Sequence, residues 1–138
     1  MIEFYKTKPD ADMPLQAHRG DAGYDLTCIE DFTVEPGKVT RVGTGIGVRQ
    51  TGQTAVLIMD RSSNPISRGI SMANGVGLID SGYSGEISGL FMASTDEPVT
   101  IKKGTRVLQA VCISYLQAEG ANVQNEHRGA NGFGSSGE

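Results

Sequence analysis

Three neighbouring residues, Arg61, Ser62 and Ser63, carry side chains suited to holding an anion. They follow the apolar run 54–59 and precede Asn64-Pro65, which predicts a turn at the end of a buried strand. A guanidinium, two hydroxyl groups and the N–H groups of a turn together can bind phosphate oxygens. Taken alone, the same residues fit a capped turn with a solvated arginine equally well.

Three further stretches carry polar groups at the ends of predicted strands. Asp25 lies in DAGYDL, residues 21–26, at the start of a predicted strand, and GTRVLQAV covers residues 104–111. In residues 73–87, ANGVGLIDSGYSGEI, Asn74-Gly75 is a hairpin-type turn signal, and Asp80 and Tyr83 flank a second tight turn. Singly, Asp25 also fits a turn cap, and Asp80 and Tyr83 also fit ordinary turn positions.

The C-terminal residues 132–137, GFGSSG, match the pattern G-x-G-x-x-G. In a dinucleotide-binding site this pattern follows a strand and opens a helix. Here only Glu138 follows it in the sequence, so we do not expect a dinucleotide-binding site. Phe133 stands alone among glycines, so we expect its ring to dock on something.

Size and charge restrict the class of protein. A chain of 138 residues is the usual size of one domain, and a net charge of −4 argues against a nucleic-acid coat or a polybasic membrane patch. No apolar leader and no long apolar run are present, which favours a cytoplasmic protein. Cys28 and Cys112 are expected to be reduced thiols, while His18 and His127 lack metal-ligand spacing and are expected at the surface.

The sequence predicts an all-β fold. Nineteen glycines interrupt it before a long helix could form, and a short helical turn is expected only near residues 61–68. Short β-rich runs separated by turn signals are typical of a sandwich or a jelly-roll-like barrel. The predicted strands cover residues 2–7, 32–34, 38–42, 46–49, 54–59, 86–93, 99–102 and 106–116.

Two of these runs, 54–59 and 106–116, are apolar on both faces instead of alternating. A strand with one face in water alternates, so both faces are expected to be covered, and another subunit is a candidate for the second cover. Residues 117–138 are polar and rich in glycine. We therefore divide the chain into a β-barrel domain, 1–116, and a flexible C-terminal arm, 117–138.

In this order the motifs AGYDL, RSS, NGVGLIDSGY, GTRVLQAV and RGANGFGSSG resemble the five motifs of the trimeric deoxyuridine triphosphatase (dUTPase) family. The resemblance spans residues 22–137. It implies a jelly-roll-like homotrimer with sites between subunits, in which the arm of one chain can close a neighbour's site. It also implies hydrolysis of dUTP to dUMP and pyrophosphate with Mg²⁺, which keeps uracil out of DNA and supplies dUMP for dTMP synthesis.

The resemblance implies that residues 73–87 bind the nucleoside and activate the attacking water. Asp80 matches the catalytic base that activates the water attacking the α-phosphate. Tyr83 matches the ring that packs under the deoxyribose and leaves no room for a 2′-hydroxyl. Asn74 and the backbone of Gly77, Leu78 and Ile79 match the groups that read uracil.

The phosphates and the metal are assigned to the other motifs in the same way. Arg61, Ser62 and Ser63 match the α- and β-phosphate cradle, and Gln109 matches a phosphate-contacting amide. Asp25 matches a carboxylate that steers Mg²⁺ through water, the ion itself lying on the triphosphate.

In the arm, Arg128 matches the clamp on the γ-phosphate and Phe133 the ring that stacks on uracil. Gly134, Ser135 and Ser136 are expected to donate N–H or O–H groups. The glycine-rich end is thus predicted to be a lid that is mobile without ligand and closes over the phosphates.

Four positions depart from the family pattern: Gly82, Asp60, Asn64-Pro65 and Ala130-Asn131. Asp60 adds a negative charge beside a phosphate site, and we expect these departures to affect affinity and lid geometry only.

Two alternative functions share the fold. A dCTP deaminase needs an acid–base residue where this chain has Leu90, and a nucleotide-responsive regulatory protein would have no need of Asp80 and the arm together. An unidentified regulatory protein partner remains compatible with the sequence.

Overall fold

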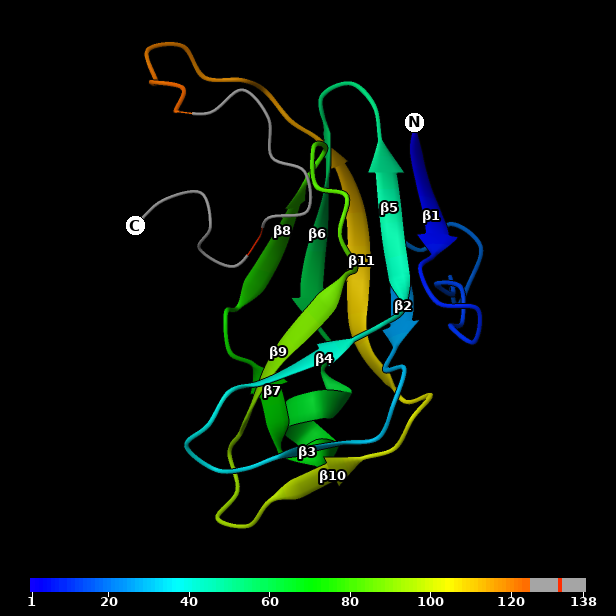
Figure 1. Cartoon of the computed structure of the whole chain (residues 1–138), viewed down its shortest axis with the longest axis vertical. Coiled ribbons are helices and arrows are strands. Elements are labelled where there is room, and N and C mark those ends of the chain that lie inside the picture. Colours follow the sequence, from blue (N-terminus) through cyan, green and yellow to red (C-terminus); the bar gives the residue numbers. More distant parts are fainter. Residues whose placement is uncertain (125–131, 133–138) are drawn as a thin grey trace.

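The computed structural model of the chain describes residues 1–124 and 132, and within them nearly all regular structure is β-strand (Figure 1). A single π-helical turn, η1 (Asn64–Arg68), follows β6, as the sequence predicts. The strands are β1 (Ile2–Lys6), β2 (Gly23–Thr27), β3 (Phe32–Val34), β4 (Thr40–Gly43), β5 (Ile46–Gln50), β6 (Thr54–Asp60), β7 (Ile70–Met72), β8 (Val76–Asp80), β9 (Ser88–Ala93), β10 (Val99–Ile101) and β11 (Arg106–Ser114).

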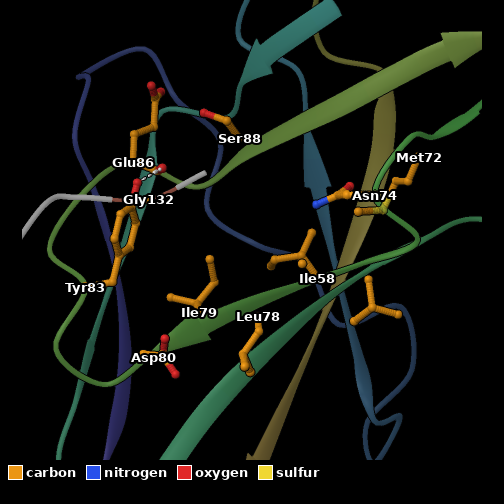
Figure 2. A pocket seen from close by; sticks show the side chains of 12 residues that line it. Ile58, Met72, Asn74, Leu78, Ile79, Asp80, Tyr83, Glu86, Ser88 and Gly132 are labelled. Carbon is orange, nitrogen blue, oxygen red and sulfur yellow. Dashed lines mark hydrogen bonds between the residues drawn. The ribbon is translucent and has the colours of Figure 1, made fainter. Parts of the chain in front are cut away.

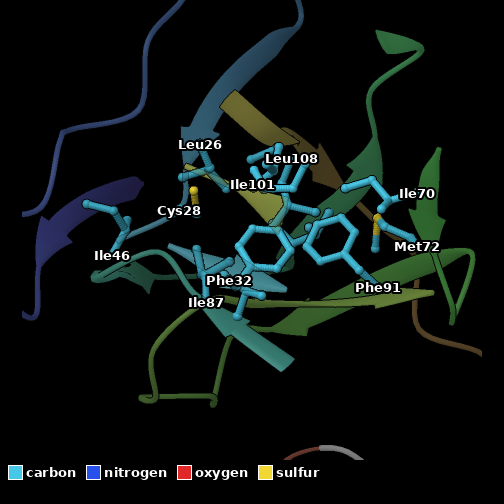
Figure 3. Close-up of a cluster of buried hydrophobic side chains, with 14 of the residues drawn as sticks. Leu26, Cys28, Phe32, Ile46, Ile70, Met72, Ile87, Phe91, Ile101 and Leu108 are labelled. Carbon is cyan, nitrogen blue, oxygen red and sulfur yellow. The ribbon is translucent and has the colours of Figure 1, made fainter. Parts of the chain in front are cut away.

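Four antiparallel sheets enclose one apolar core. The largest has the order β2-β11-β6-β8, and the others pair β4-β9-β7, β1-β5 and β10-β3. Phe32 and Phe91 stack at the centre with ring centroids 5.6 Å apart, surrounded by aliphatic side chains such as Leu108 and Ile70 (Figure 3). Consecutive strands often belong to different sheets, which is typical of a jelly roll. The predicted all-β, jelly-roll-like class is confirmed.

The eight strands predicted from apolar runs are all present, with ends that differ by a few residues. Two short strands, β7 and β8, were not predicted, because Gly and Asn residues interrupt that part of the sequence. Asp25 lies in the middle of β2, two residues after the first residue of the strand and not at its start.

The predicted hairpin at Asn74-Gly75 is wrong. A tight turn is present, with the Val76 amide donating to the Asn74 carbonyl at 2.8 Å and Gly75 at φ +71°. However, β7 pairs with β9, whereas β8 pairs with β6, so the turn connects two different sheets. The left-handed conformation of Gly75 lets the chain cross between them.

The large sheet is apolar on its outer face. Leu57 lies opposite Leu78 on β8 and Val111 on β11, and Met59 lies opposite Val76, so these side chains share a face. Leu78 is 59% exposed and Val76 is 51% exposed. The sequence predicts that both faces of strands 54–59 and 106–116 are covered. Within a single chain, only the inner face of these strands is covered.

Residues 117–124 form no helix or strand and are exposed. Most of the rest of the predicted arm lies outside the described residues, so the division of the chain at 116 stays a prediction. In the described part of the chain, no helix has the length and apolar character needed to cross a membrane.

Candidate active site

A cavity of about 230 Å³ opens along β8, which we call the β8 pocket (Figure 2). Its floor is apolar, formed by Ile58, Met72 and Ile79, and its walls carry polar groups. A pocket of this size holds one small ligand, and the few polar groups decide its orientation. The remaining lining residues are Asn74, Val76, Gly77, Leu78, Asp80, Tyr83, Glu86, Ser88 and Gly132.

The backbone of β8 is itself a recognition element. β8 is the last strand of its sheet, so alternate N–H and C=O groups along it point away from β6 and into the pocket. At Gly77 a Cβ would approach Ile58 Cβ to 3.3 Å and the Asn74 amide nitrogen to 3.9 Å. The Asn74 amide therefore lies beside this edge, and the absence of a side chain at Gly77 leaves the backbone accessible.

Asp80 and Tyr83 stand at the end of β8, joined by a turn in which the Tyr83 amide donates to the Asp80 carbonyl at 3.0 Å. The Tyr83 hydroxyl donates to the Glu86 carbonyl at 2.9 Å, and the ring lies directly on Gly85. The Gln50 amide donates to the carbonyls of Ile79 and Asp80 at 3.1 and 3.2 Å. These contacts fix a half-buried carboxylate and an aromatic ring on one wall of the pocket.

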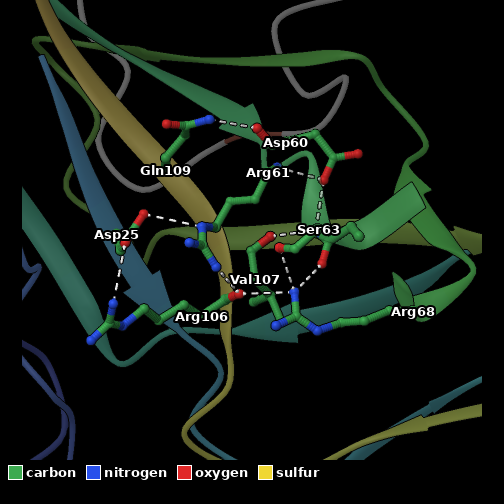
Figure 4. A network of polar contacts seen from close by, with 9 residues as sticks. Asp25, Asp60, Arg61, Ser63, Arg68, Arg106, Val107 and Gln109 are labelled. Atoms are coloured by element: carbon green, nitrogen blue, oxygen red, sulfur yellow. Dashed lines mark hydrogen bonds and ion pairs between the residues drawn. The ribbon is translucent and has the colours of Figure 1, made fainter. Parts of the chain in front are cut away.

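A second cavity, of about 460 Å³, lies at the other edge of the same sheet, and we call it the Arg61 cleft. The Arg61 Nε donates to Asp25 at 3.1 Å and its Nη1 donates to the Arg106 carbonyl at 2.9 Å, which holds the guanidinium in place (Figure 4). A fixed guanidinium suits phosphate oxygens. The lining residues are Ala17, Asp21, Ala22, Gly23, Asp25, Arg61, Ser62, Ser63 and Gln109.

The Ser63 hydroxyl can donate a hydrogen bond to a ligand in the cleft. Its Oγ accepts from Arg68 Nη1 at 2.9 Å, so its own hydroxyl hydrogen is left for another acceptor. The same Arg68 nitrogen donates to Asn64 Oδ1 at 2.9 Å, and Asn64 is completely buried. Asn64 thus belongs to the support beneath the anion-binding turn.

The residues of the cleft fit a Mg²⁺ ion only if most of its ligands come from outside the chain. Mg²⁺ takes carboxylate and phosphate oxygens and keeps several waters. Asp25 supplies one carboxylate, and the Gln109 amide oxygen lies over Gly23, where a Cβ would come within 2.9 Å of it. Among the described residues no group of three His, Cys, Asp or Glu side chains could enclose a metal ion, so phosphate and water would have to complete the coordination.

The structure divides the predicted site residues into two sets. Asn74, the 77–79 backbone, Asp80 and Tyr83 line the β8 pocket, whereas Asp25, Arg61, Ser62, Ser63 and Gln109 line the Arg61 cleft. In the sheet, β2 and β8 are three strands apart, and the register offsets Asp25 from Asp80 by a further four residues. These spacings place the two Cα atoms about 20 Å apart.

The arm residues Arg128, Phe133, Gly134, Ser135 and Ser136 lie outside the described residues. Gly132, which begins the glycine-rich motif, is described and lies against the Tyr83 ring, 3.5 Å from Cε1 to a Cβ built on it. Gly132 thus lies at the β8 pocket of its own chain. Leu90 lines neither cavity.

Several supporting residues were not predicted. Glu86 lines the β8 pocket and accepts from the Gly45 amide, and Gln50 holds the end of β8. Asn64, Arg68 and Arg106 support the Arg61 cleft. Arg106 lies within the GTRVLQAV motif and could have been singled out, and Asn64 and Arg68 make several of their contacts within residues 60–68. Glu86 and Gln50 act through contacts between distant residues that no local pattern reveals.

The sequence predicts that Asp60 places a negative charge beside the phosphate site, but in the structure its carboxylate points elsewhere. It does not line the Arg61 cleft, and its carboxylate accepts from the Arg61 amide at 2.9 Å and the Asn64 amide group at 2.6 Å. It also accepts from the Met72 amide at 2.9 Å. The carboxylate is therefore occupied by the protein's own N–H groups, and it faces away from the anion site.

The chain thus combines an all-β fold, a small pocket on an edge strand and a separate cleft whose groups suit an anion. The sequence model of the dUTPase family matches residues 9–137, and the chain belongs to this family. It is 37% identical to the deoxyuridine 5′-triphosphate nucleotidohydrolase of Nautilia profundicola, over 99% of this chain and 98% of the relative. Identity to the Corynebacterium diphtheriae nucleotidohydrolase is 35%, over 99% and 93%.

Solved structures agree with this assignment. A dUTPase from Streptococcus mutans superposes with a TM-score of 0.78 at 30% identity, covering 85% of this chain and 98% of that one. A mutant dUTPase from phage phi11 of S. aureus, described with a structural Mg(II) ion, superposes with a TM-score of 0.78 over 91% and 97%. At 20% identity, the phage structure supports the fold alone.

Proposed function

We propose that this chain hydrolyses dUTP to dUMP and pyrophosphate. The observation that carries the proposal is that a base-sized pocket on an edge strand holds Asn74, Asp80 and Tyr83 together, while the groups suited to phosphate line the Arg61 cleft. Membership of the dUTPase family supports the same reaction.

Uracil is read by the edge of β8 near Gly77 and by Asn74. The edge offers N–H and C=O groups at fixed spacing, and the amide beside Gly77 offers a donor and an acceptor. Cytosine presents a donor where uracil presents an acceptor. Because an unpaired polar group in a buried pocket is costly, we expect strong selection against cytosine.

Asp80 acts as the general base. It takes a proton from water, the water oxygen forms a bond to the α-phosphorus, and the bond from that phosphorus to the α,β-bridging oxygen breaks to release pyrophosphate. A positioned base of this kind contributes about 10²–10⁴ in rate. Tyr83 packs under the sugar and excludes a ribose 2′-hydroxyl.

The Arg61 cleft holds the phosphate chain. Arg61, Ser62 and Ser63 contact the α- and β-phosphates, and Gln109 adds an amide. Asp25 steers Mg²⁺ through coordinated water, and the ion, when bound, neutralises charge on the phosphates. Arg128 clamps the γ-phosphate, Phe133 stacks on uracil, and Gly134, Ser135 and Ser136 donate hydrogen bonds.

Each active site combines two chains of a homotrimer. A general base must reach its proton directly or through one water, so Asp80 cannot serve a phosphate held beside Asp25 about 20 Å away in the same chain. A neighbouring chain can supply the missing half. The exposed apolar side chains of the large sheet, including Val76 and Leu78, support burial against that neighbour.

The test is pyrophosphate release from a panel of deoxy- and ribonucleoside triphosphates, with and without Mg²⁺, together with the mass of the oligomer by light scattering. We expect release from dUTP well above dCTP, dTTP and UTP, stimulation by Mg²⁺, and three times the chain mass. Asp80→Asn is the matched control, because it should bind dUTP without hydrolysing it. Equal release from dCTP, or activity in a monomer, would contradict the proposal.

A further inference from the structure

Asp60, the last residue of β6, has one carboxylate that accepts hydrogen bonds from residues of both cavities. Its Oδ1 accepts from the Arg61 amide at 2.9 Å and from Asn64 Nδ2 at 2.6 Å. Its Oδ2 accepts from the Met72 amide at 2.9 Å. Arg61 lines the Arg61 cleft and Met72 lines the β8 pocket, so one side chain contacts the backbone of both half-sites.

The connection extends further on each side. The main-chain carbonyl of Asp60 accepts a hydrogen bond from the Gln109 amide at 2.8 Å. Asn64, which donates to Asp60, accepts from Arg68, and Arg68 also donates to Ser63. On the other side, Met72 is followed by Ala73 and Asn74, the start of the segment that forms the edge of the β8 pocket. Positions that contact phosphate and positions that contact the base are therefore tied to the same residue.

A carboxylate is required for this arrangement. Three N–H donors converge on Asp60, two on one oxygen and one on the other. A carboxylate accepts through both oxygens, whereas an amide of the same shape accepts through one and donates through the other. Among side chains of this length, only the Asp carboxylate can satisfy all three donors.

We propose that Asp60 is a positioning residue that holds the phosphate-binding turn and the base-reading segment in a fixed relation. The inference rests on the proposed function. In the proposed trimer the two half-sites of one chain serve different active sites, so no single substrate molecule can align them, and the protein must do so itself. Asp60 thereby contributes to base selection although it touches no ligand.

Asp60→Asn keeps the side-chain volume nearly unchanged, preserves the connection to the phosphate-binding turn and breaks the connection to Met72. Its single carbonyl oxygen remains with the two donors, Arg61 N and Asn64 Nδ2, so the Met72 amide faces another N–H group and loses its acceptor. We expect the ratio of kcat/KM for dUTP to kcat/KM for dCTP to fall about tenfold, the size expected for one hydrogen bond to a charged group. Asn64→Ala breaks the opposite connection and should raise KM for dUTP while leaving that ratio within about twofold.

A control separates positioning from simple loss of stability. Val34→Ala removes a buried side chain in β3, away from both cavities, and lowers the melting temperature with no change in the dUTP-to-dCTP ratio. All variants are assayed well below their melting temperatures. An unchanged ratio in Asp60→Asn, or an equal fall in Val34→Ala, would overturn the role of Asp60.

A folded Asp60→Glu provides the same measurement if Asp60→Asn yields no folded protein. Glu keeps the charge but moves the oxygens by one methylene, so the three donors cannot all be reached in the present geometry and the ratio should again fall. Retention of the wild-type ratio in that variant would refute the inference. A wild-type chain that releases no pyrophosphate from dUTP would instead refute the proposed function.

Discussion

Tyr83 offers a direct test of how the site selects the sugar. Its ring lies on Gly85, where a Cβ would come within 2.5 Å of Cζ, and its hydroxyl donates to the Glu86 carbonyl at 2.9 Å. The ring is therefore held at its face and at its tip. Two substitutions separate these features, because Tyr83→Phe removes the hydroxyl only and Tyr83→Ala removes the wall.

The two variants should differ by more than an order of magnitude. Loss of the hydroxyl removes one hydrogen bond, about 1 kcal/mol, so Tyr83→Phe should lower selection for dUTP over UTP by at most about fivefold. Loss of the ring opens space for a 2′-hydroxyl. Tyr83→Ala should therefore lower that selection by about 10², and it should also slow dUTP hydrolysis.

The assay is pyrophosphate release at subsaturating dUTP and UTP, which gives the ratio of the two kcat/KM values directly. Wild-type selection in Tyr83→Ala would show that another group excludes the ribose. An equal loss in Tyr83→Phe and Tyr83→Ala would show that the hydroxyl, not the bulk of the ring, carries the selection.

Four further predictions follow from the site and the core. Asp80→Asn should keep dUTP binding, measured by calorimetry, while turnover falls by a factor on the order of 10² or more, and near-normal turnover would remove Asp80 from the role of base. Truncation after Glu126 should leave the melting temperature and the oligomer nearly unchanged but sharply reduce hydrolysis, because Arg128 and Phe133 are lost; full activity would contradict the role of the arm. Cys28 is 1% exposed and burial raises its pKa, so a thiol reagent should modify it far more slowly in the native protein than in urea. For the same reason the free energy of unfolding should fall as the pH rises above the ordinary thiol pKa, because the unfolded chain loses that proton first. Burial raises the pKa of Cys112 as well, so Cys28→Ala should weaken this dependence without removing it.

The sequence by itself determined where most strands lie and which residues carry chemistry. Apolar runs between Gly- and Pro-containing turns are local signals, so 32–34 and 54–59 are strands at nearly the predicted positions. The motif around Arg61 also indicated an anion site, because its guanidinium and hydroxyl groups are adjacent in the chain. The family was equally readable, since five motifs occur in order along residues 22–137.

Only the tertiary structure decided how these pieces combine, because strand pairing joins residues that are distant in the chain. Nothing near Asn74-Gly75 reveals that β7 and β8 pair with different strands, so a turn between sheets was predicted as a hairpin. The separation of Asp25 from Asp80 follows from the order of β2, β11, β6 and β8, which no local pattern contains. The carboxylate of Asp60 looked like an added charge in the sequence, but the donors that occupy it come from Arg61, Asn64 and Met72, and folding alone brings Met72, twelve residues away, into contact.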